Sequence, residues 1–465
     1  MTNSNRNAGG CLVRIAIVGG GPGGLFTAWH LNELCDRPVD LTIFEAADRL
    51  GGKLHTPTFS AAPVRYEAGA AEFYDYSPVG DDPLLELIRS FGLPTVGLGG
   101  GQVQVAGRPI ANLDDLQEAF GPGARRDLID FDTWAHGAIT PREFFESGSD
   151  YTASATPAGR FDGALAGQAS PTIRTYLEAM IHSDLATPPA ATSVAYGLQN
   201  YLMNDPAYMR LYCIAGGNEQ LITALATRIS ATVRLATPVE RVATTPDGRW
   251  RLTTRSVEGC CDQDFDAVVL SLPVEALKRL TFADPDLTAA MRQHITHHDH
   301  PAHYLRITLL LDQPLGRAAG DDGYLMLEAF GGCCLYLESG REPDASQGVL
   351  GWLLGGEAAA ALADRTDDEL VASALDTLPA AFAAVRGQVL EARVHRWTAA
   401  VSGLPGGWQP LSVDHRHRPA GATHPGLFVV GDYLYDSTIN GVLDSAEHVA
   451  GWLAADLIDA SRETR

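Results

Sequence analysis

Residues 13–24 read VRIAIVGGGPGG, and this stretch decides the fold. The apolar, β-branched run over 13–18 is typical of a buried parallel strand, and a glycine cluster follows it at once. Residues 25–34 (LFTAWHLNEL) have helical spacing, and residues 40–44 (DLTIF) form a second apolar run. The order strand, turn, helix and strand predicts a βαβ crossover, which is the building unit of parallel α/β sheets.

The glycine cluster between strand and helix has the spacing G-x-G-x-x-G. The turn consists of Gly19, Gly21, Pro22, Gly23 and Gly24. In such a turn the first glycine permits the tight bend, the second lets the backbone approach a pyrophosphate, and the third lets the helix pack closely on the strand. The free N–H groups at the helix N-terminus also attract a diphosphate. This turn therefore predicts a dinucleotide site.

A carboxylate and a second glycine pair follow the second strand. Glu45 ends that strand, where it can accept hydrogen bonds from ribose hydroxyls and repels a 2′-phosphate, so NADP is not expected. Four residues past Glu45 begins the stretch Arg49-Leu50-Gly51-Gly52-Lys53. A second backbone approach to the diphosphate, flanked by cations, favours a longer and more enclosed cofactor than NAD.

Residues 45–53 (EAADRLGGK) resemble the E-x-x-x-R-x-G-G-[RK] stretch of flavin-containing amine oxidases. That superfamily includes monoamine, polyamine and L-amino acid oxidases, with protoporphyrinogen oxidase and phytoene desaturase as more distant relatives. The resemblance implies that the cofactor is FAD. It also implies that the FAD site includes Glu45, Ala46, Arg49, Gly51, Gly52 and Lys53.

Further landmarks occur in the order that this family has. Residues 66–73 (YEAGAAEF) resemble the loop that passes the flavin ring, which implies cofactor contacts from Gly69, Ala70 and Ala71. Residues 215–221 (AGGNEQL) resemble the G-G-x-x-x-L segment that precedes the adenine-side strand. Val239 and Val242 resemble the strand whose backbone meets adenine.

The segment from 426 onward predicts a strand, a loop and a helix. Within it, Gly431-Asp432 and Asn440-Gly441-Val442 resemble the C-terminal flavin motif of the family. Asp432 ends an apolar strand, where its carboxylate could accept hydrogen bonds from ribityl or ribose hydroxyls. A helix that starts near Gly441 would direct its N-terminus at the flavin pyrimidine edge and stabilise negative charge there.

The length of 465 residues predicts two structural domains. We expect an α/β protein with a discontinuous Rossmann-type FAD-binding domain and a substrate-binding domain of mixed sheet and helices. The expected FAD-binding segments are 11–75, 205–285 and 395–460. The substrate-binding segments are 76–204 and 286–394, and residues 1–10 are expected to be a disordered tail.

Arg306 is the first candidate catalytic residue. Many members of the family have a lysine, linked through water to the flavin N5, on the strand that follows the substrate domain. Counting back from Gln313-Pro314, Arg306 stands at the matching position. Arginine stays charged near neutral pH and cannot act as a base. Arg306 could anchor a carboxylate or a water, or it could extend from the strand to solvent.

Glu72 is the second candidate catalytic residue. L-amino acid oxidases resemble this loop but have an arginine there that clamps the substrate carboxylate, so a glutamate would suit a cationic amine or guanidinium. A structural ion pair with a neighbouring arginine is the alternative. Aromatic side chains that could enclose an amine come from two regions. The substrate candidates are Phe73, Tyr74, Trp408 and Tyr435, with Tyr76 and Tyr433 nearby and Thr438 where the family has a cage tyrosine.

Composition excludes several other functions. The net charge of -23 argues against nucleic-acid binding and could steer cationic substrates. The seven cysteines show no C-x-x-C spacing, so neither a disulfide framework nor a zinc site is expected, and a cytoplasmic location fits. No cysteine stands where the family attaches flavin covalently, which implies noncovalent FAD. No apolar run is long enough for a membrane span.

Histidines gather between 294 and 303, next to Asp299. They lack the H-E-x-x-H arrangement, so we interpret this segment as a solvated connector rather than a metal site. The sequence leaves the oligomeric state open, with a homodimer as one candidate.

These observations favour an FAD-dependent oxidoreductase that oxidises a C–N bond of an amine or amino-acid-derived substrate by hydride transfer to flavin N5. Molecular oxygen is the candidate acceptor, and specialised metabolism is the expected setting. A desaturase or isomerase acting on C–C bonds is the first alternative. A non-enzymatic, GDI-like escort protein that has lost its flavin is the second.

Overall fold

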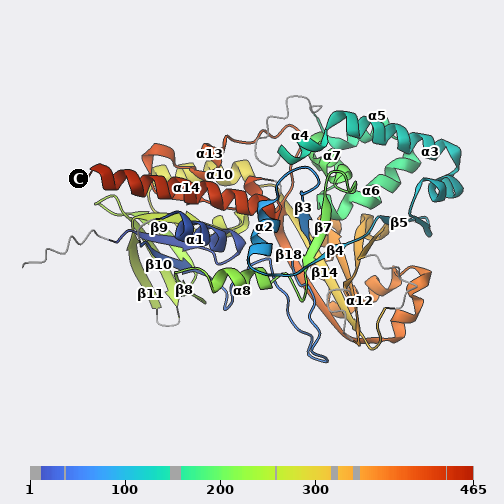
Figure 1. The fold of residues 1–465 in the computed structure, drawn as a ribbon, viewed down its shortest axis with the longest axis horizontal. Coiled ribbons are helices and arrows are strands. Elements are labelled where there is room, and N and C mark those ends of the chain that lie inside the picture. The colour runs from blue at the N-terminus through green and yellow to red at the C-terminus, as the bar shows by residue number, and fades with distance from the viewer. Residues whose placement is uncertain are drawn as a thin grey trace, which may run out of the picture.

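The computed structural model describes residues 12–35, 38–146, 159–256, 259–315, 323–338, 346–435 and 437–463. These residues form two lobes side by side (Figure 1). One lobe contains both the first helix, α1 (Pro22–Leu34), and the last helix, α14 (Ile439–Glu463). The first and last described helices thus lie in the same lobe. The tail expected at 1–10 lies outside the described residues.

A parallel five-stranded sheet forms the centre of this first lobe. Its order is β19-β12-β1-β2-β8, and every neighbouring pair is parallel. The strands are β1 (Arg14–Val18), β2 (Asp40–Phe44), β8 (Thr232–Arg234), β12 (Ala267–Leu270) and β19 (Leu427–Val429). Strands from the start, middle and end of the chain therefore share one sheet, and the predicted α/β fold class is confirmed.

Helices α1 and α14 cover one face of the sheet. Ile15 and Ile17 of β1 share a buried cluster with Leu25 of α1 and Leu443 of α14. Pro22 occupies the first turn of α1, where its missing N–H costs nothing and its fixed φ suits the helix. The phosphate-loop end of α1 is therefore fixed by both sequence and packing.

A smaller four-stranded sheet extends the first lobe. Its order is β11-β10-β9-β13. The strands are β9 (Val239–Thr244), β10 (Trp250–Ser256), β11 (Gly259–Phe265) and β13 (Thr281–Phe282), and the lobe also contains α2 (Pro83–Ser90), α8 (Gln220–Ala226), α9 (Val274–Leu277), α10 (Pro285–His298) and α13 (Val413–His417). Leu287 and Met291 of α10 pack in the same buried cluster as Val268 of β12, so α10 belongs to this lobe.

A seven-stranded mixed sheet forms the centre of the second lobe. Its order is β18-β14-β17-β16-β15-β5-β6. The strands are β5 (Gln102–Val105), β6 (Arg108–Ile110), β14 (Pro301–Leu311), β15 (Tyr324–Leu327), β16 (Cys333–Leu337), β17 (Gly348–Gly355) and β18 (Val389–Ser402). One face packs against α11 (Gly356–Leu362) and α12 (Asp367–Asp376) through residues such as Leu305, Leu370 and Ala374.

A group of helices covers the other face of the seven-stranded sheet. The helices are α3 (Leu113–Ala138), α4 (Pro141–Glu146), α5 (Phe161–Gln168), α6 (Pro171–Leu185) and α7 (Val194–Leu202). Phe131 of α3, Leu177 of α6 and Met326 of β15 belong to one buried cluster between helices and sheet. Because successive strand residues point to opposite faces, the same strands serve both layers.

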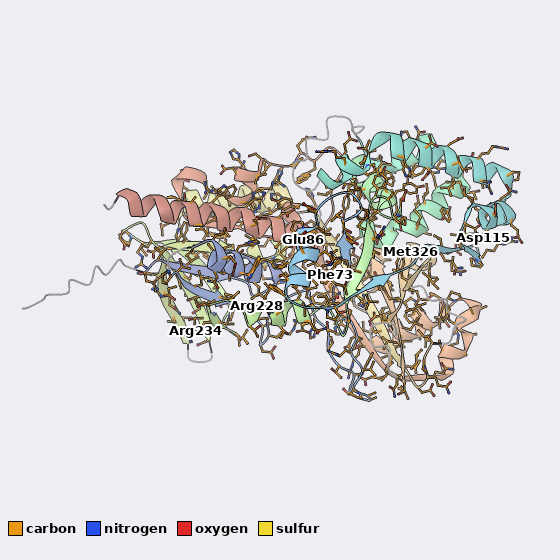
Figure 2. The ribbon with its side chains drawn as sticks, viewed as in Figure 1. Phe73, Glu86, Asp115, Arg228, Arg234 and Met326 are labelled. Carbon is orange, nitrogen blue, oxygen red and sulfur yellow. The ribbon has the colours of Figure 1, made fainter. Side chains whose placement is uncertain are left out.

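A short three-stranded sheet lies where the lobes meet. Its order is β3-β7-β4, with β3 (Phe73–Asp75), β4 (Thr95–Leu98) and β7 (Arg210–Ile214). Figure 2 shows Phe73 between Arg234 in the first lobe and Met326 in the second. Among the described residues, none of the helices combines the length and apolar character that a membrane crossing requires.

Two features differ from the sequence-based expectations. The histidine segment is not a solvated connector, because His294, His297 and His298 lie in the last turns of α10. The expected domain bounds at 285–286 and 394–395 also fall inside α10 and β18. We therefore propose that these two domain boundaries lie just after α10 and just after β18. The other domain boundaries stay where the sequence predicts them.

Candidate active site

The phosphate loop leaves open space above one of its glycines. At Gly19, with φ +110°, an added Cβ would lie 2.1 Å from the Ser271 carbonyl oxygen, and at Gly24 it would lie 2.1 Å from the Gly19 oxygen. These two glycines are required by the protein's own packing. At Gly21 an added Cβ would meet only the Gly52 Cα, at 3.9 Å. The missing side chain of Gly21 thus opens a cradle into which a diphosphate fits.

Glu45 is held beside this loop by backbone donors. Its Oε2 accepts from the Gly20 N–H at 2.7 Å, and its Oε1 accepts from the Ala47 N–H at 2.8 Å. Each carboxylate oxygen can accept a further hydrogen bond. The carboxylate is therefore oriented by the chain and can still take ribose hydroxyls. Val239 is the first residue of β9.

The second glycine pair packs directly on the first loop. The Gly51 N–H donates to the Gly20 oxygen at 2.9 Å, and an added Cβ on Gly52 would lie 3.3 Å from the Gly21 Cα. Arg49 stabilises this turn because its Nη2 donates to the Gly52 oxygen at 2.7 Å. Gly51 and Gly52 both have positive φ, at 107° and 52°, a region that favours glycine.

Lys53 connects this turn to the C-terminal part of the chain. Its Nζ forms an ion pair with Asp432 and donates to the Ala400 oxygen at 2.5 Å. The Lys53 oxygen accepts from the Ala70 N–H at 3.0 Å. An added Cβ on Gly69 would lie 1.9 Å from that same oxygen. The loop 69–71 is therefore held against Lys53, opposite Asp432.

The start of α14 completes the groove. Thr438 caps the helix, since its Oγ1 accepts from the Gly441 N–H at 3.0 Å and its carbonyl accepts from the Val442 N–H at 3.1 Å. The Asn440 amide donates to Asp82 at 3.4 Å. Asp432 follows β19 and Gly431. The donors and acceptors around the groove fit a flavin dinucleotide, with a cation and a helix N-terminus near its far end.

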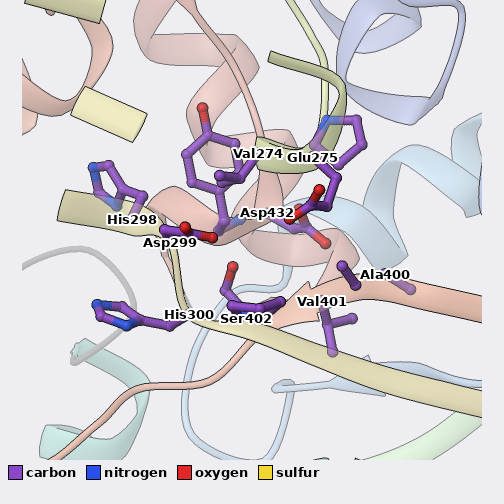
Figure 3. A pocket seen from close by; sticks show the side chains of 13 residues that line it. Val274, Glu275, His298, Asp299, His300, Ala400, Val401, Ser402 and Asp432 are labelled. Carbon is purple, nitrogen blue, oxygen red and sulfur yellow. Dashed lines mark hydrogen bonds between the residues drawn. The ribbon is translucent and has the colours of Figure 1, made fainter. Parts of the chain in front are cut away.

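A small cavity lies beside Asp432. It is lined by Pro273, Val274, Glu275, the segment 298–301, the segment 399–402, Asp432 and Tyr433. Figure 3 shows Asp432 between the histidines on one side and Ala400 to Ser402 on the other. His298 is buried at 2% exposure, and burial lowers its pKa to about 2, so it stays neutral.

A second cavity, which we call the acidic cavity, lies in the second lobe next to β3. Two carboxylates and three tyrosines are among its lining residues, which are Glu72, Tyr74, Asp184, Met203, Asn204, Leu211, Tyr324, Met326, Cys334 and Tyr336. Strand alternation explains this set. Tyr74 pairs with Leu211 across β3 and β7, and both point to the cavity, whereas Phe73 and Tyr212 point into the first lobe.

The acidic cavity disfavours negative charge. Burial and the neighbouring Glu72 raise the pKa of Asp184 to about 8. Burial also raises the pKa of Tyr74 and Tyr336 well above 10, so these hydroxyls stay neutral. Asp184 was not identified from the sequence, because a single aspartate near a helix end carries no local signal. Glu72, the sequence candidate, shares the cavity with it.

Arg306 lies on the cavity-facing side of the seven-stranded sheet, but its charge is already matched. Its Nη2 forms an ion pair with Glu338, and both side chains are buried at 0% and 4% exposure. The other oxygen of Glu338 accepts from the Glu67 N–H at 3.1 Å. The guanidinium also lies 4.9 Å from the Tyr336 ring centre. Of the alternatives for Arg306, extension from the strand to solvent is wrong, because β14 lies between β18 and β17 and the side chain is buried.

Several predicted aromatic residues lie outside the described lining of the acidic cavity. Phe73 packs on Tyr212, with ring centres 5.5 Å apart. Trp408 donates to the His297 oxygen at 3.0 Å. Tyr435 is buried beneath Arg416, 4.6 Å from its guanidinium. Of the predicted substrate residues, Tyr74 lines the cavity.

The histidines pack with aromatic side chains. The His294 Nε2 lies 3.1 Å from the Tyr433 hydroxyl, and the His297 ring centre lies 5.3 Å from that of Trp408. Burial lowers the pKa of His294 to about 3. In the described ranges, no group of three or more His, Cys, Asp or Glu is placed to hold a metal ion.

Comparison with known families decides the assignment. The model of the flavin containing amine oxidoreductases matches residues 22–453. The chain belongs to this family. It is therefore a flavin-dependent oxidoreductase, and the resemblance noted in the sequence is confirmed. The match extends from the first residue of α1 into α14.

Relatives and solved structures agree with this membership. A segment of 87 residues is 41% identical to tryptophan 2-monooxygenase of Rhizobium rhizogenes, and it spans 18% of this chain and 11% of that enzyme. Cyclohexylamine oxidase from Brevibacterium oxydans IH-35A has a TM-score of 0.72 at 19% identity, covering 96% of this chain and 99% of that one. These likenesses to solved structures establish the fold of this amine oxidoreductase.

Two further structures have the same fold. Wild-type putrescine oxidase bound to putrescine has a TM-score of 0.71 at 17% identity, covering 96% of this chain and 99% of that one. A putative protoporphyrinogen oxidase from Exiguobacterium sp. 255-15 has a TM-score of 0.70 at 17% identity, with the same shares covered. The fold therefore includes neighbours named for amines and one named for a tetrapyrrole.

Proposed function

We propose that this amine oxidoreductase binds FAD noncovalently and oxidises a C–N bond of a cationic amine held in the acidic cavity. The observation that supports this proposal most directly is the position of Glu72. It lies in the cavity and directly follows the loop 69–71 that is held against Lys53. A carboxylate in a low-dielectric cavity attracts an ammonium or guanidinium group.

The residues that would hold the cofactor follow from the groove. Gly21 leaves room for the diphosphate, Glu45 would accept ribose hydroxyls, and Asp432 would accept ribityl hydroxyls. The N-terminus of α14 would face the flavin ring and favour negative charge there. When bound, the flavin supplies the hydride acceptor for the substrate carbon, and oxygen is the proposed final acceptor.

The residues of the second lobe would bind and orient the amine. Glu72 holds the cation, and the neutral Tyr74 and Tyr336 offer hydroxyls and ring faces. Buried Arg306 keeps its charge and is fixed by Glu338. The names cyclohexylamine oxidase and putrescine oxidase among the structural neighbours support an amine substrate. The net charge of -23 would assist the encounter with cations.

The test is anaerobic mixing of the purified yellow protein with a panel of amines and amino acids. We expect cationic amines to bleach the flavin absorbance and zwitterionic amino acids to do so more weakly, because Glu72 repels a carboxylate. Glu72→Gln should raise the apparent Kd for amines roughly 10-fold, the scale of one charged hydrogen bond. Glu86→Gln, at an exposed position on α2, is the control and should have no effect.

Two results would replace this proposal. Bleaching by alkene or tetrapyrrole substrates alone would favour the desaturase alternative, for which the protoporphyrinogen oxidase-like fold is the supporting observation. A colourless protein that takes up no added FAD would favour the escort alternative. A cytoplasmic location and a role in specialised metabolism remain parts of the proposal.

A further inference from the structure

Asp184 occupies an unfavourable position for a negative charge. It is the penultimate residue of α6, where the helix carbonyls carry partial negative charge. It shares the acidic cavity with Glu72, whose charge acts on it directly. Among the described residues, Glu72 is the charged side chain that acts on Asp184, and it disfavours the ionised form. A cation that enters the cavity favours the ionised form of Asp184, so the carboxyl group then releases its proton more readily.

The other groups around the cavity do not compensate this charge. Ionisable side chains approach it from five other elements, namely Tyr74 on β3, Tyr196 on α7, Tyr304 on β14, Tyr324 on β15, and Cys334 and Tyr336 on β16. Burial raises the pKa of Tyr74, Tyr304, Cys334 and Tyr336. These groups are neutral near pH 7. His182, on the same helix as Asp184, is directed at the Gly355 oxygen, 3.3 Å from its Nε2.

Amine oxidation by hydride loss needs a neutral nitrogen, whereas an amine arrives as an ammonium ion. Arg306 cannot accept the proton that must leave, because a guanidinium stays protonated and this one is paired with Glu338. A cavity that binds the cation through one carboxylate needs a second group to hold its proton. Asp184 is the second carboxylate of the acidic cavity.

We propose that Asp184 releases its own proton to solvent when the cation enters the cavity and then accepts the proton of the substrate ammonium group, while Glu72 remains ionised. In this step one N–H bond of the ammonium breaks, its electron pair stays on nitrogen, and an O–H bond forms on Asp184. The net charge of substrate and carboxylates is unchanged. The inference rests on the proposed amine oxidation, and it defines the substrate as an amine that binds as a cation with at least one N–H bond.

The raised pKa makes the neutral amine accessible. An alkylamine has a pKa near that of lysine, ~10.4, so an ordinary aspartate of pKa ~3.9 would leave roughly one bound amine in 10⁶ neutral. With the Asp184 pKa at about 8, that fraction rises to roughly one in a few hundred. The gain depends first on the burial of Asp184 and second on the neighbouring charge of Glu72, because both raise its pKa.

Proton release on binding a permanent cation tests this role without any oxidation. Tetramethylammonium would be titrated into the flavin-loaded protein at pH 7, with calorimetry in two buffers of different ionisation enthalpy. We expect release of close to one proton per bound cation in the wild type and none in Asp184→Asn. Asp376→Asn removes an exposed carboxylate at the end of α12 and should behave as the wild type. Absence of cation binding, or unchanged proton release in Asp184→Asn, would overturn the proposal.

The pH profile of flavin reduction gives the second readout. With an amine that bleaches the flavin, the second-order rate constant should rise with pH through an inflection near 8 in the wild type. Asp184→Asn should lose that inflection and about 100-fold in rate, and Asp184→Glu should restore part of both. A purely structural role would lower the rate at every pH and keep the inflection. Failure of every amine to bleach the flavin would instead refute the proposed function, so the two failures are distinguishable.

Discussion

Lys53 and Asp432 form an ion pair although 379 positions separate them in the chain. Lys53 belongs to the second glycine turn, which packs on the phosphate loop, and Asp432 follows the last strand of the parallel sheet. The same ammonium group also contacts the Ala400 oxygen at the end of β18. Three segments that are distant in the chain therefore converge at Lys53.

Removing the Asp432 carboxylate should weaken flavin binding. Asp432→Ala loses an acceptor for the ribityl hydroxyls and leaves Lys53 with the Ala400 oxygen. A hydrogen bond to a charged group contributes ~1.5–3 kcal/mol, so the apparent Kd for FAD should rise at least ~10-fold. Quenching of FAD fluorescence by the apoprotein measures this change. Asp414→Ala, at an exposed aspartate 3.6 Å from Arg418, should leave the Kd unchanged, and equal values for both variants would contradict the assignment.

A single methyl group at Gly21 should block the diphosphate cradle. The residue has φ -76°, so alanine fits the backbone without strain, and its Cβ would meet no protein atom closer than 3.9 Å. We expect Gly21→Ala to fold normally and to lose at least ~10-fold in FAD affinity, since the second glycine of the motif admits the pyrophosphate. Circular dichroism checks the fold and the bound-flavin absorbance checks the affinity.

Gly123→Ala is the matched control for that experiment. An added Cβ there would meet nothing within 4 Å, and the residue lies in α3, far along the chain from the groove. It should retain full flavin content. A Gly21→Ala protein that kept its flavin as well would show that the cradle does not hold the diphosphate.

Local signals allowed the cofactor half of the molecule to be predicted from sequence. The strand–turn–helix order over 13–34 and the carboxylate at Glu45 depend on residues that are close together in the chain. In the structure, β1, α1 and β2 begin and end within a few residues of the expected bounds. The order of the remaining family motifs then predicted that both chain ends share one lobe. The positions and spacing of the glycines supplied most of the information for this prediction.

The seven-stranded sheet was much harder to predict. Strands β15 to β18 were not identified, because Cys333–Leu337 and Gly348–Gly355 are buried on both faces and show no alternation. Val389–Ser402 carries charged residues on its half-exposed faces and so lacks an apolar pattern. Glu338, the partner of Arg306, and Asp184, the neighbour of Glu72, are brought to these residues by contacts between segments that are far apart in the chain. Sequence spacing cannot reveal such contacts.

Breaking the buried Arg306–Glu338 pair should destabilise the second lobe. Arg306→Met leaves the Glu338 carboxylate buried without its cation, and loss of one partner of a buried pair costs about 3–5 kcal/mol. Replacing both residues, Arg306→Met with Glu338→Leu, should recover most of this loss. Urea unfolding followed by tryptophan fluorescence measures the change. An Arg306→Met protein as stable as the wild type would show that the pair contributes little.

Asp184→Asn should stabilise the protein at alkaline pH. The pKa of Asp184 is raised from 3.8 to about 8, so the folded state holds a proton that the unfolded state releases between these values. The stabilisation that this proton provides is complete below pH ~4 and is lost as the pH rises through 8. Asparagine mimics the protonated form at every pH. The variant should therefore match the wild type near pH 4 and exceed it above pH 8 by on the order of a few kcal/mol.

Thermal unfolding of the flavin-loaded proteins at pH 4.5 and pH 8.5 measures this difference. Asp376→Asn is again the control, because its exposed carboxylate is paired with Arg386 at 2.9 Å and should show no alkaline gain. Higher alkaline stability combined with slower amine oxidation in Asp184→Asn would mean that the acidic cavity sacrifices stability for function, a pattern common at sites that must hold charge. If Asp184→Asn unfolded at the same temperature as the wild type at both pH values, Asp184 would be ionised and solvated in the resting protein, and the carboxylate pair could not store the substrate's proton.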